Sequence, residues 1–159
     1  MTVTTAPASL TTDELSALVR SIADQPDLWR PIVRFTQAER WWTRLEGPDG
    51  VDVWLLSWLP AQGTEPHDHG RSNAAFTVVA GTLTELRPDE AGDLVPTPFD
   101  AGRTQTVDVG QIHDVVNVGH EPAVSIHAYS PPLEQMTYYR RGEHGLVPSR
   151  TVETTEPEE

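Results

Sequence analysis

Apolar residues near the start of the chain recur with the period of a helix. These positions are Leu15, Leu18, Val19 and Ile22. Thr11, followed three residues later by Glu14, has the spacing of a capping box, and a helix does not usually continue through a proline such as Pro26. We therefore predict an amphipathic helix that begins after Thr11 and ends before Pro26. A second short helix is predicted over residues 28–34.

After about residue 38 the pattern changes to short apolar runs rich in β-branched and aromatic residues. The predicted strands cover residues 40–45, 51–59, 75–79, 82–86, 104–109, 115–118, 123–129 and 135–140. The run Val53 to Leu56 is apolar at consecutive positions, which predicts a strand buried on both faces. Short strands separated by Gly, Pro and Asp predict an all-β antiparallel sandwich or barrel.

The length of 159 residues fits one domain with a real hydrophobic core. We predict that residues 1–37 form a helical cap on this domain and that residues 38–148 form the β-barrel. Residues 149–159 are acidic and nearly free of apolar side chains, so this tail is predicted to be disordered.

The charge balance restricts the partners. The chain has 24 acidic and 11 basic residues, a net charge of −13, so we expect no binding to nucleic acid or to anionic membranes. Every basic residue is an arginine, which excludes lysine Schiff-base chemistry and leaves arginine to hold an anionic substrate. Cysteine is absent as well, which excludes disulfides, thiolate nucleophiles and iron–sulfur clusters.

Location follows from what the sequence lacks. No apolar run approaches the roughly 18 residues of a membrane span. The first ten residues have neither the positive region nor the apolar stretch of a signal peptide. We therefore expect a cytoplasmic protein.

Three histidines carry the clearest chemical signal. On an extended strand, residues i and i+2 project to the same face, so His67 and His69 can bind one ion together. His113, in the run from Gly110 to Asn117, supplies a third imidazole from a later strand. Neutral imidazole is a good ligand for iron, zinc, copper or nickel, and at this point the metal stays open.

The spacing around these histidines resembles the two signature motifs of the cupin superfamily. The motifs read Gly63-x3-His67-x-His69-x4-Ala74-x6-Gly81 and Gly102-x5-Asp108-x-Gly110-x2-His113-x3-Asn117. Ala74 stands where many cupins carry a glutamate that serves as a fourth ligand. The resemblance implies a cupin jelly-roll with a three-histidine site and no ligand carboxylate.

Residues 40 to about 142 are also similar to the type I cysteine dioxygenases, which are thiol dioxygenases of the cupin superfamily. The most diagnostic stretch alternates Ser125, His127 and Tyr129 with apolar residues. The resemblance implies that Tyr129 lies beside the metal, with Ser125 and His127 holding its orientation. Some relatives cross-link this tyrosine to a cysteine, which Ala74 replaces here.

The same resemblance implies three substrate contacts. The Tyr129 hydroxyl would hydrogen-bond the substrate carboxylate or bound oxygen. Arg44, in the run Trp42-Thr-Arg44, would face the pocket and bind the substrate carboxylate in a two-pronged hydrogen bond. Met136 would contact the substrate or, equally well, fill the core.

The implied reaction is the oxidation of L-cysteine by O2 to cysteine sulfinic acid, on Fe(II) bound by His67, His69 and His113. Three neutral imidazoles add no negative charge to the site, so a substrate thiolate can bind without repulsion from a ligand carboxylate. Another small thiol, 3-mercaptopropionate or cysteamine, and a non-catalytic metal-binding cupin module are the alternatives. We expect the protein to be a monomer.

Overall fold

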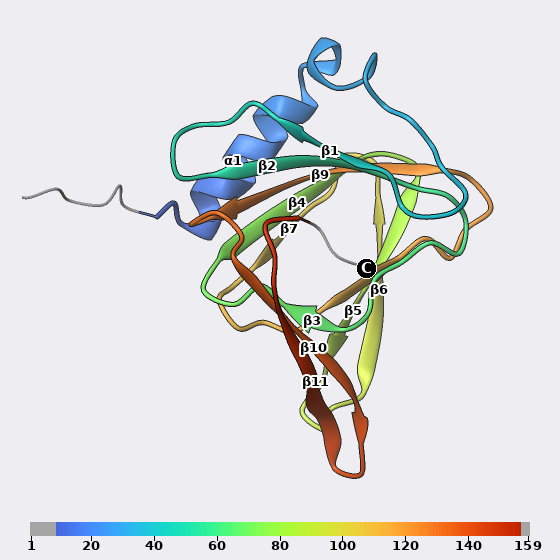
Figure 1. The fold of residues 1–159 in the computed structure, drawn as a ribbon. Coiled ribbons are helices and arrows are strands. Elements are labelled where there is room, and N and C mark those ends of the chain that lie inside the picture. The colour runs from blue at the N-terminus through green and yellow to red at the C-terminus, as the bar shows by residue number, and fades with distance from the viewer. Residues whose placement is uncertain (1–8, 157–159) are drawn as a thin grey trace, which may run out of the picture.

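The computed structural model describes residues 9–156 and shows a mainly β domain (Figure 1). Its helical elements are α1 (Thr12–Ala23) and the short 3₁₀-helix η1 (Pro26–Leu28). Its strands are β1 (Trp42–Leu45), β2 (Asp52–Trp58), β3 (His67–Asp68), β4 (Asn73–Ala80), β5 (Thr82–Pro88), β6 (Leu94–Asp100), β7 (Thr104–Val107), β8 (Asp114–Val116), β9 (Ala123–Ser130), β10 (Gln135–Gly142) and β11 (Gly145–Glu153).

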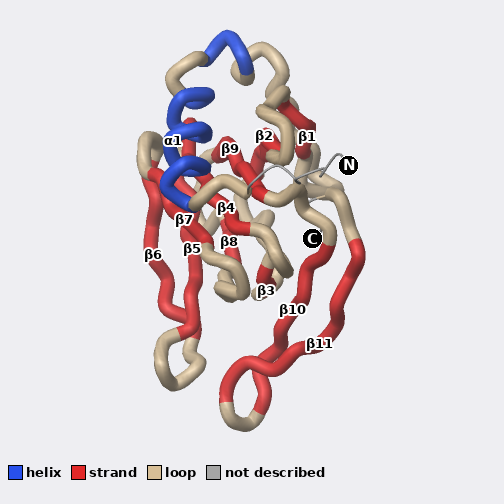
Figure 2. Tube along the Cα trace, turned by 90° about the vertical axis from the view of Figure 1, so that its left-hand side faces the viewer, coloured by secondary structure: helices blue, strands red, loops and turns tan. Residues whose placement is uncertain are grey.

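The strands form three antiparallel sheets. Their orders are β1-β2-β9-β4-β7, β11-β10-β3 and β6-β5-β8. A bridge between His67 and His113 links the second sheet to the third. Figure 2 shows that the hairpins β5–β6 and β10–β11 both extend away from α1. The predicted all-β antiparallel architecture is confirmed.

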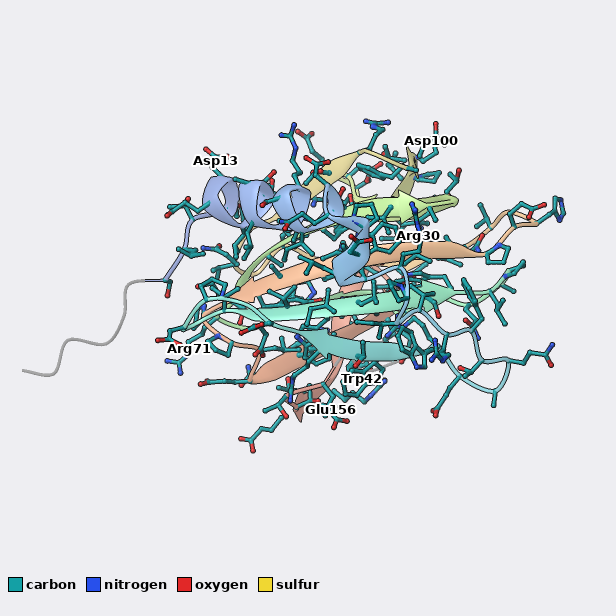
Figure 3. The ribbon with its side chains drawn as sticks, turned by 90° about the horizontal axis from the view of Figure 1, so that it is seen from above. Asp13, Arg30, Trp42, Arg71, Asp100 and Glu156 are labelled. Atoms are coloured by element: carbon teal, nitrogen blue, oxygen red, sulfur yellow. The ribbon has the colours of Figure 1, made fainter. Side chains whose placement is uncertain are left out.

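The central strands β2 and β9 are buried on both faces, as predicted for Val53 to Leu56. We call the apolar layer beneath α1 the outer cluster; its members are Leu15, Val19, Ile22, Trp29, Val53, Leu55, Ala75, Val124, Ile126 and Ala128. The inner cluster, on the opposite face of the sheet, is built around Trp54, Leu56, Trp58, Phe76, Leu83, Val107 and Tyr138. Figure 3 shows α1 with its axis roughly along the direction of the neighbouring strands.

The first helix forms as predicted. The Thr11 hydroxyl accepts a hydrogen bond from the Glu14 amide, and the Glu14 carboxylate accepts one from the Thr11 amide, each 3.1 Å long. The prediction of a second helix over residues 28–34 is wrong, because η1 ends at Leu28. Pro31 explains the failure, since a proline disfavours helical geometry at the residue before it.

Three strands are missing from the predicted set, and one of them is the two-residue β3, which carries His67. β6 contains two prolines and is mostly exposed, and β11 is mostly exposed and polar. The prediction that residues 149–159 are disordered is therefore wrong for residues 149–153, which pair with β10. Backbone hydrogen bonds to one neighbour hold this edge strand in place, and only the partly buried Val152 packs from residues 149–153 against the inner cluster. Residues 157–159 lie outside the described residues.

Within residues 9–156, none of the helices has both the length and the apolar composition needed to cross a membrane.

Candidate metal centre

The structure brings together the three predicted histidine ligands. Nε2 of His69 lies 3.2 Å from Nε2 of His67 and 3.4 Å from Nε2 of His113. All three side chains are buried, and their candidate ligand atoms lie within 4.8 Å of one another. Two imidazole nitrogens bound to one ion at about 2.1 Å lie about 3.0–3.4 Å apart when the angle at the ion is about 90–110°. The observed spacing therefore fits a shared metal ion.

Backbone pairing places two of these ligands. His67 in β3 and His113, just before β8, exchange two backbone hydrogen bonds of 2.9 Å each. The side chains of such a directly opposed pair project to the same face. His69 follows from β3, where Asp68 points elsewhere: its carboxylate accepts hydrogen bonds from the Tyr139 hydroxyl (2.6 Å) and the Gly70 amide (2.9 Å). These bonds close the turn that brings His69 back to the site.

Hydrogen bonds also fix how two of the ligands are protonated. Nδ1 of His67 lies 2.6 Å from the Glu65 carbonyl oxygen, and Nδ1 of His113 lies 2.9 Å from a Glu85 carboxylate oxygen. Both partners only accept hydrogen bonds, so each Nδ1 must carry the proton. Nε2 of both rings is then left with a lone pair that is available to a metal.

Burial favours the neutral form of the ligands. The pKa values of His67 and His69 lie well below the ordinary value, first because burial penalises the charged ring and then because neighbouring histidines repel a proton. Metal-binding imidazole must be unprotonated, so these rings bind a cation near neutral pH without first losing a proton.

Ala74 leaves the ligand set without a carboxylate. It lies in β4 directly opposite Tyr129 in β9 and is buried. The register confirms that this position faces the site, but a methyl group supplies neither a metal ligand nor a thiol. The site therefore consists of three imidazoles.

A small cavity opens beside the histidines. It is lined by Arg40, Leu56, Trp58, Thr64, His67, His113, Val115, His127, Tyr129 and Met136. The lining is largely apolar apart from a few polar groups, as is typical of small-molecule sites. Met136 is buried and accepts a weak hydrogen bond on sulfur from the Tyr138 hydroxyl (3.9 Å), so it both lines the cavity and fills the core.

The arginine in this cavity is Arg40, and the placement predicted for Arg44 is wrong. Arg44 in β1 is exposed and donates a hydrogen bond to the Thr155 carbonyl. Its strand register explains this position. Arg44 pairs with Trp54, whose fully buried ring fills the interior, and the guanidinium carbon lies 5.2 Å from the centre of that ring. Figure 3 places Trp42 of β1 and Glu156 near the chain end on the same side of the molecule.

Arg40 comes from the loop before β1 and was not predicted as a site residue. It is 4% exposed, and its guanidinium carbon lies 4.5 Å from the centre of the Trp58 ring. A buried arginine needs an anionic or aromatic partner, but the burial of Arg40 is seen only in the structure and leaves no signal in the sequence. The side-chain direction of a loop residue cannot be read from strand alternation.

The three polar residues of β9 share one face, as their spacing predicts. The Ser125 hydroxyl lies 2.7 Å from Nε2 of His127 and accepts a hydrogen bond from the Trp58 indole (2.9 Å). The pKa of His127 lies well below its ordinary value because of burial and then because of the nearby Arg40 charge. His127 is thus held by Ser125 and is separate from the three-histidine cluster.

Tyr129 lies against the metal site. Its ring centre is 5.0 Å from that of His69, and its hydroxyl pKa is raised by burial. The side chain therefore stays a neutral phenol that can donate a hydrogen bond. His120 and His144 are exposed in loops.

The chain is similar to proteins of a known family. Residues 4–142 match the family of cysteine dioxygenase type I. Over 153 residues the chain is 30% identical to cysteine dioxygenase type 1 of Danio rerio, covering 87% of this chain and 76% of that protein.

Two solved structures resemble the fold. A conserved protein with a double-stranded β-helix domain from Klebsiella pneumoniae has a TM-score of 0.56 at 20% identity, covering 76% of this chain and 93% of its own. A cupin superfamily protein from Desulfitobacterium hafniense has a TM-score of 0.54 at 11% identity, covering 65% of this chain and 87% of its own. The predicted cupin jelly-roll is confirmed.

Proposed function

Since the chain belongs to the cysteine dioxygenase type I family, we propose that it oxidises L-cysteine with O2 to cysteine sulfinic acid, using Fe(II) held by His67, His69 and His113. The observation that carries the proposal is the three-imidazole cluster beside a cavity that also contains a buried arginine. Bound there, iron would supply the redox chemistry that O2 requires. The reaction balances as R–SH + O2 → R–SO2H, with the sulfur giving up the four electrons that O2 accepts.

The ligand set favours an anionic sulfur. With Ala74 in place of a carboxylate, the three histidines add no negative charge to the cation that they bind. A thiolate entering the cavity is therefore attracted by the full charge of the ion, and the low local dielectric strengthens this attraction.

Arg40 is the candidate for binding the substrate carboxylate. It is buried in the cavity wall and always charged, and its planar guanidinium matches a carboxylate in a two-pronged hydrogen bond. The stacking of this guanidinium on Trp58 orients the fork. A buried positive charge also disfavours cysteamine, whose free end is an ammonium group.

Tyr129 and the polar residues behind it orient the reacting groups. The neutral Tyr129 hydroxyl donates a hydrogen bond to a substrate carboxylate or to an oxygen atom at the reacting sulfur. The chain from Trp58 through Ser125 to His127 holds one polar wall of the cavity in place. The apolar side chains of the cavity keep water away from the reactive sulfur.

Oxygen consumption by the chain reconstituted anaerobically with Fe(II) tests the proposal. L-Cysteine should be consumed with one equivalent of O2, and the product should be the sulfinate. No O2 uptake with saturating cysteine and bound iron would overturn the proposal.

A matched pair of arginine variants tests the assignment of the carboxylate site. Arg40→Gln should lower kcat/KM for L-cysteine by about 10²-fold or more, since a buried charge-assisted pair is lost. Arg44→Gln, four residues away and exposed, should stay within about twofold of the parent chain. The reverse ranking would return the role to Arg44.

The second candidate is 3-mercaptopropionate, and Arg40 is the observation that favours it. This thiol carries the same carboxylate but lacks the amine. A substrate panel separates the two, because an enzyme specific for cysteine should use 3-mercaptopropionate with a clearly lower kcat/KM. If 3-mercaptopropionate is preferred, the physiological thiol is different while the chemistry is the same.

A further inference from the structure

Glu85 is a buried carboxylate placed immediately behind the metal site. It lies in β5, is 2% exposed, and accepts four hydrogen bonds. Nδ1 of His113 lies 2.9 Å from Oε2, which also accepts a bond of 3.2 Å from Nη2 of Arg87. Oε1 accepts bonds of 2.9 Å from Nε of Arg87 and from the Gln105 amide. A buried charge is tolerated only when it is paired this completely.

These bonds leave Glu85 no freedom to turn toward the metal. Both of its oxygens are already engaged, and the Arg87 guanidinium that grips it also donates a hydrogen bond to the Thr106 carbonyl. The arrangement ties β5 to β7, because Gln105 and Thr106 belong to β7. Glu85 is thus a fixed support for His113 and not a ligand.

The three ligands differ in the hydrogen-bond partner of Nδ1, the ring nitrogen that faces away from the ion. His113 is backed by the Glu85 carboxylate, whereas His67 is backed by the neutral Glu65 carbonyl. Nδ1 of His69 is buried and has no hydrogen-bond partner among the described residues. A carboxylate partner fixes the ring and makes its other nitrogen a stronger donor, and a carbonyl does so less strongly.

We propose that Glu85 is the positioning residue for His113: it locks the Nδ1–H tautomer, aims Nε2 at the shared ion and strengthens its donation. His113 is then the strongest of the three ligands, and His69 the weakest. The assignment holds whichever thiol the cavity takes, so it goes beyond the proposed function.

The test is a titration of the metal-free full-length chain with Co²⁺, whose visible absorption reports the coordination geometry. Glu85→Gln keeps the shape of the side chain but removes its charge, and should weaken Co²⁺ binding on the order of 10- to 100-fold, with a changed absorption spectrum. Glu65→Gln is the matched control. The Glu65 carboxylate is half-exposed and pairs with Arg150, and only the Glu65 backbone carbonyl contacts His67. The Co²⁺ affinity of this variant should therefore stay within about twofold of that of the parent chain.

A double-mutant cycle separates positioning from a general effect on the fold. In a His113→Ala background, Glu85→Gln should change the remaining Co²⁺ affinity by less than about twofold, because its target is gone. The proposal would be overturned if Glu85→Gln weakened Co²⁺ binding as much in the His113→Ala background as in the parent chain. It would also be overturned if Glu85→Gln weakened Co²⁺ binding less than twofold in the parent chain. No thiol or oxygen enters this titration, so its outcome is independent of the proposed reaction.

A second variant covers the possibility that Glu85→Gln does not fold. Gln105→Met removes one donor to Glu85 and leaves its charge in place. It should weaken Co²⁺ binding about threefold, a smaller version of the same effect. Unchanged affinity in this variant would overturn the proposal.

Discussion

The eight residues of strand β9 alternate between two faces of the sheet, and the two faces differ in their chemistry. Val124, Ile126 and Ala128 face the outer cluster, where α1 covers them with aliphatic side chains. Ser125, His127 and Tyr129 face the other way and carry a hydroxyl, an imidazole and a phenol, and the last two of them line the cavity. Successive side chains of a strand point to opposite faces. Alternate residues of β9 therefore contribute to stability on one face and to the candidate site on the other.

The difference is energetic as well as chemical. The outer cluster contains fully buried aliphatic residues such as Leu15, and each contributes about 1.5–3 kcal/mol of apolar burial. On the inner face, burial of polar groups costs free energy that hydrogen bonds offset only in part. We therefore expect changes on the outer face to alter stability and changes on the inner face to alter function.

The largest effect should come from removing a metal ligand on the inner side. His67→Ala should weaken metal binding by about 10²-fold or more and lower kcat/KM by at least about 10³-fold, because two imidazoles hold the ion far less firmly than three. Metal analysis and the oxygen assay measure both effects. His120→Ala, which changes an exposed loop histidine, is the control and should bind metal normally.

The inner face should also make the metal-free fold sensitive to acid. Burial lowers the pKa of His67, His69 and His127, so the unfolded chain binds protons first as the pH falls below about 6.5. Stability is then full above that pH and declines below it, by up to about 1.4 kcal/mol per pH unit for each histidine.

Urea unfolding of the metal-free chain between pH 7.5 and 5.5 measures this decline. Replacing His127 with Gln should remove about a third of the slope, since one of the three titrating groups is lost. A stability that does not vary with pH over this range would contradict the neutral state assigned to these rings.

The outer cluster should respond in the opposite way. Leu15→Ala removes a fully buried side chain beneath α1 and should lower the free energy of unfolding by about 2–4 kcal/mol. At a temperature where the variant is folded, kcat/KM should stay within about twofold of the parent chain. Leu28→Ala, at a residue that is 47% exposed, should change stability by less than about 0.5 kcal/mol.

The smallest predicted effect tests the polar wall. Trp58→Phe removes the indole that donates to Ser125, and the loss of one buried hydrogen bond should cost about 1 kcal/mol and lower kcat several-fold. Metal content should be unchanged. Trp41→Phe, a change of the same size on the outer side, should leave kcat unaffected, and equal losses in both variants would remove the distinction between the two faces.

The three ligands were predictable because their signals are local. The His-x-His pair and the eight-residue motif around His113 mark the ligands in the sequence, although a turn after β3, and not strand alternation, brings His69 to the site. Arg40 was not predictable in this way, because it precedes β1 and its direction depends on how the loop crosses Trp58. Arg44 satisfied the expected pattern, but Trp54 already occupies the space beneath it.

The missed strands have a similar explanation. β6 and β11 each pair with a single neighbour, so they need no apolar alternation and tolerate prolines. Alternating apolar residues in a sequence indicate a buried strand. An edge strand that is held mainly by backbone hydrogen bonds shows little of this alternation. The longer buried strands β2, β4 and β9 were predicted, whereas β3, with only two residues, was too short to show a pattern.

The backbone bridge between His67 and His113 also bears on how the protein matures. These residues are 46 positions apart in the chain, and each brings its imidazole to the site only when the two sheets meet. An unfolded chain offers the local His67–His69 pair alone, so the metal binds the completed fold more tightly than any precursor. Each tenfold excess of free metal over its dissociation constant then adds about 1.4 kcal/mol to the stability of the native state. A higher concentration of free metal in the cell would therefore raise the fraction of the protein that is folded.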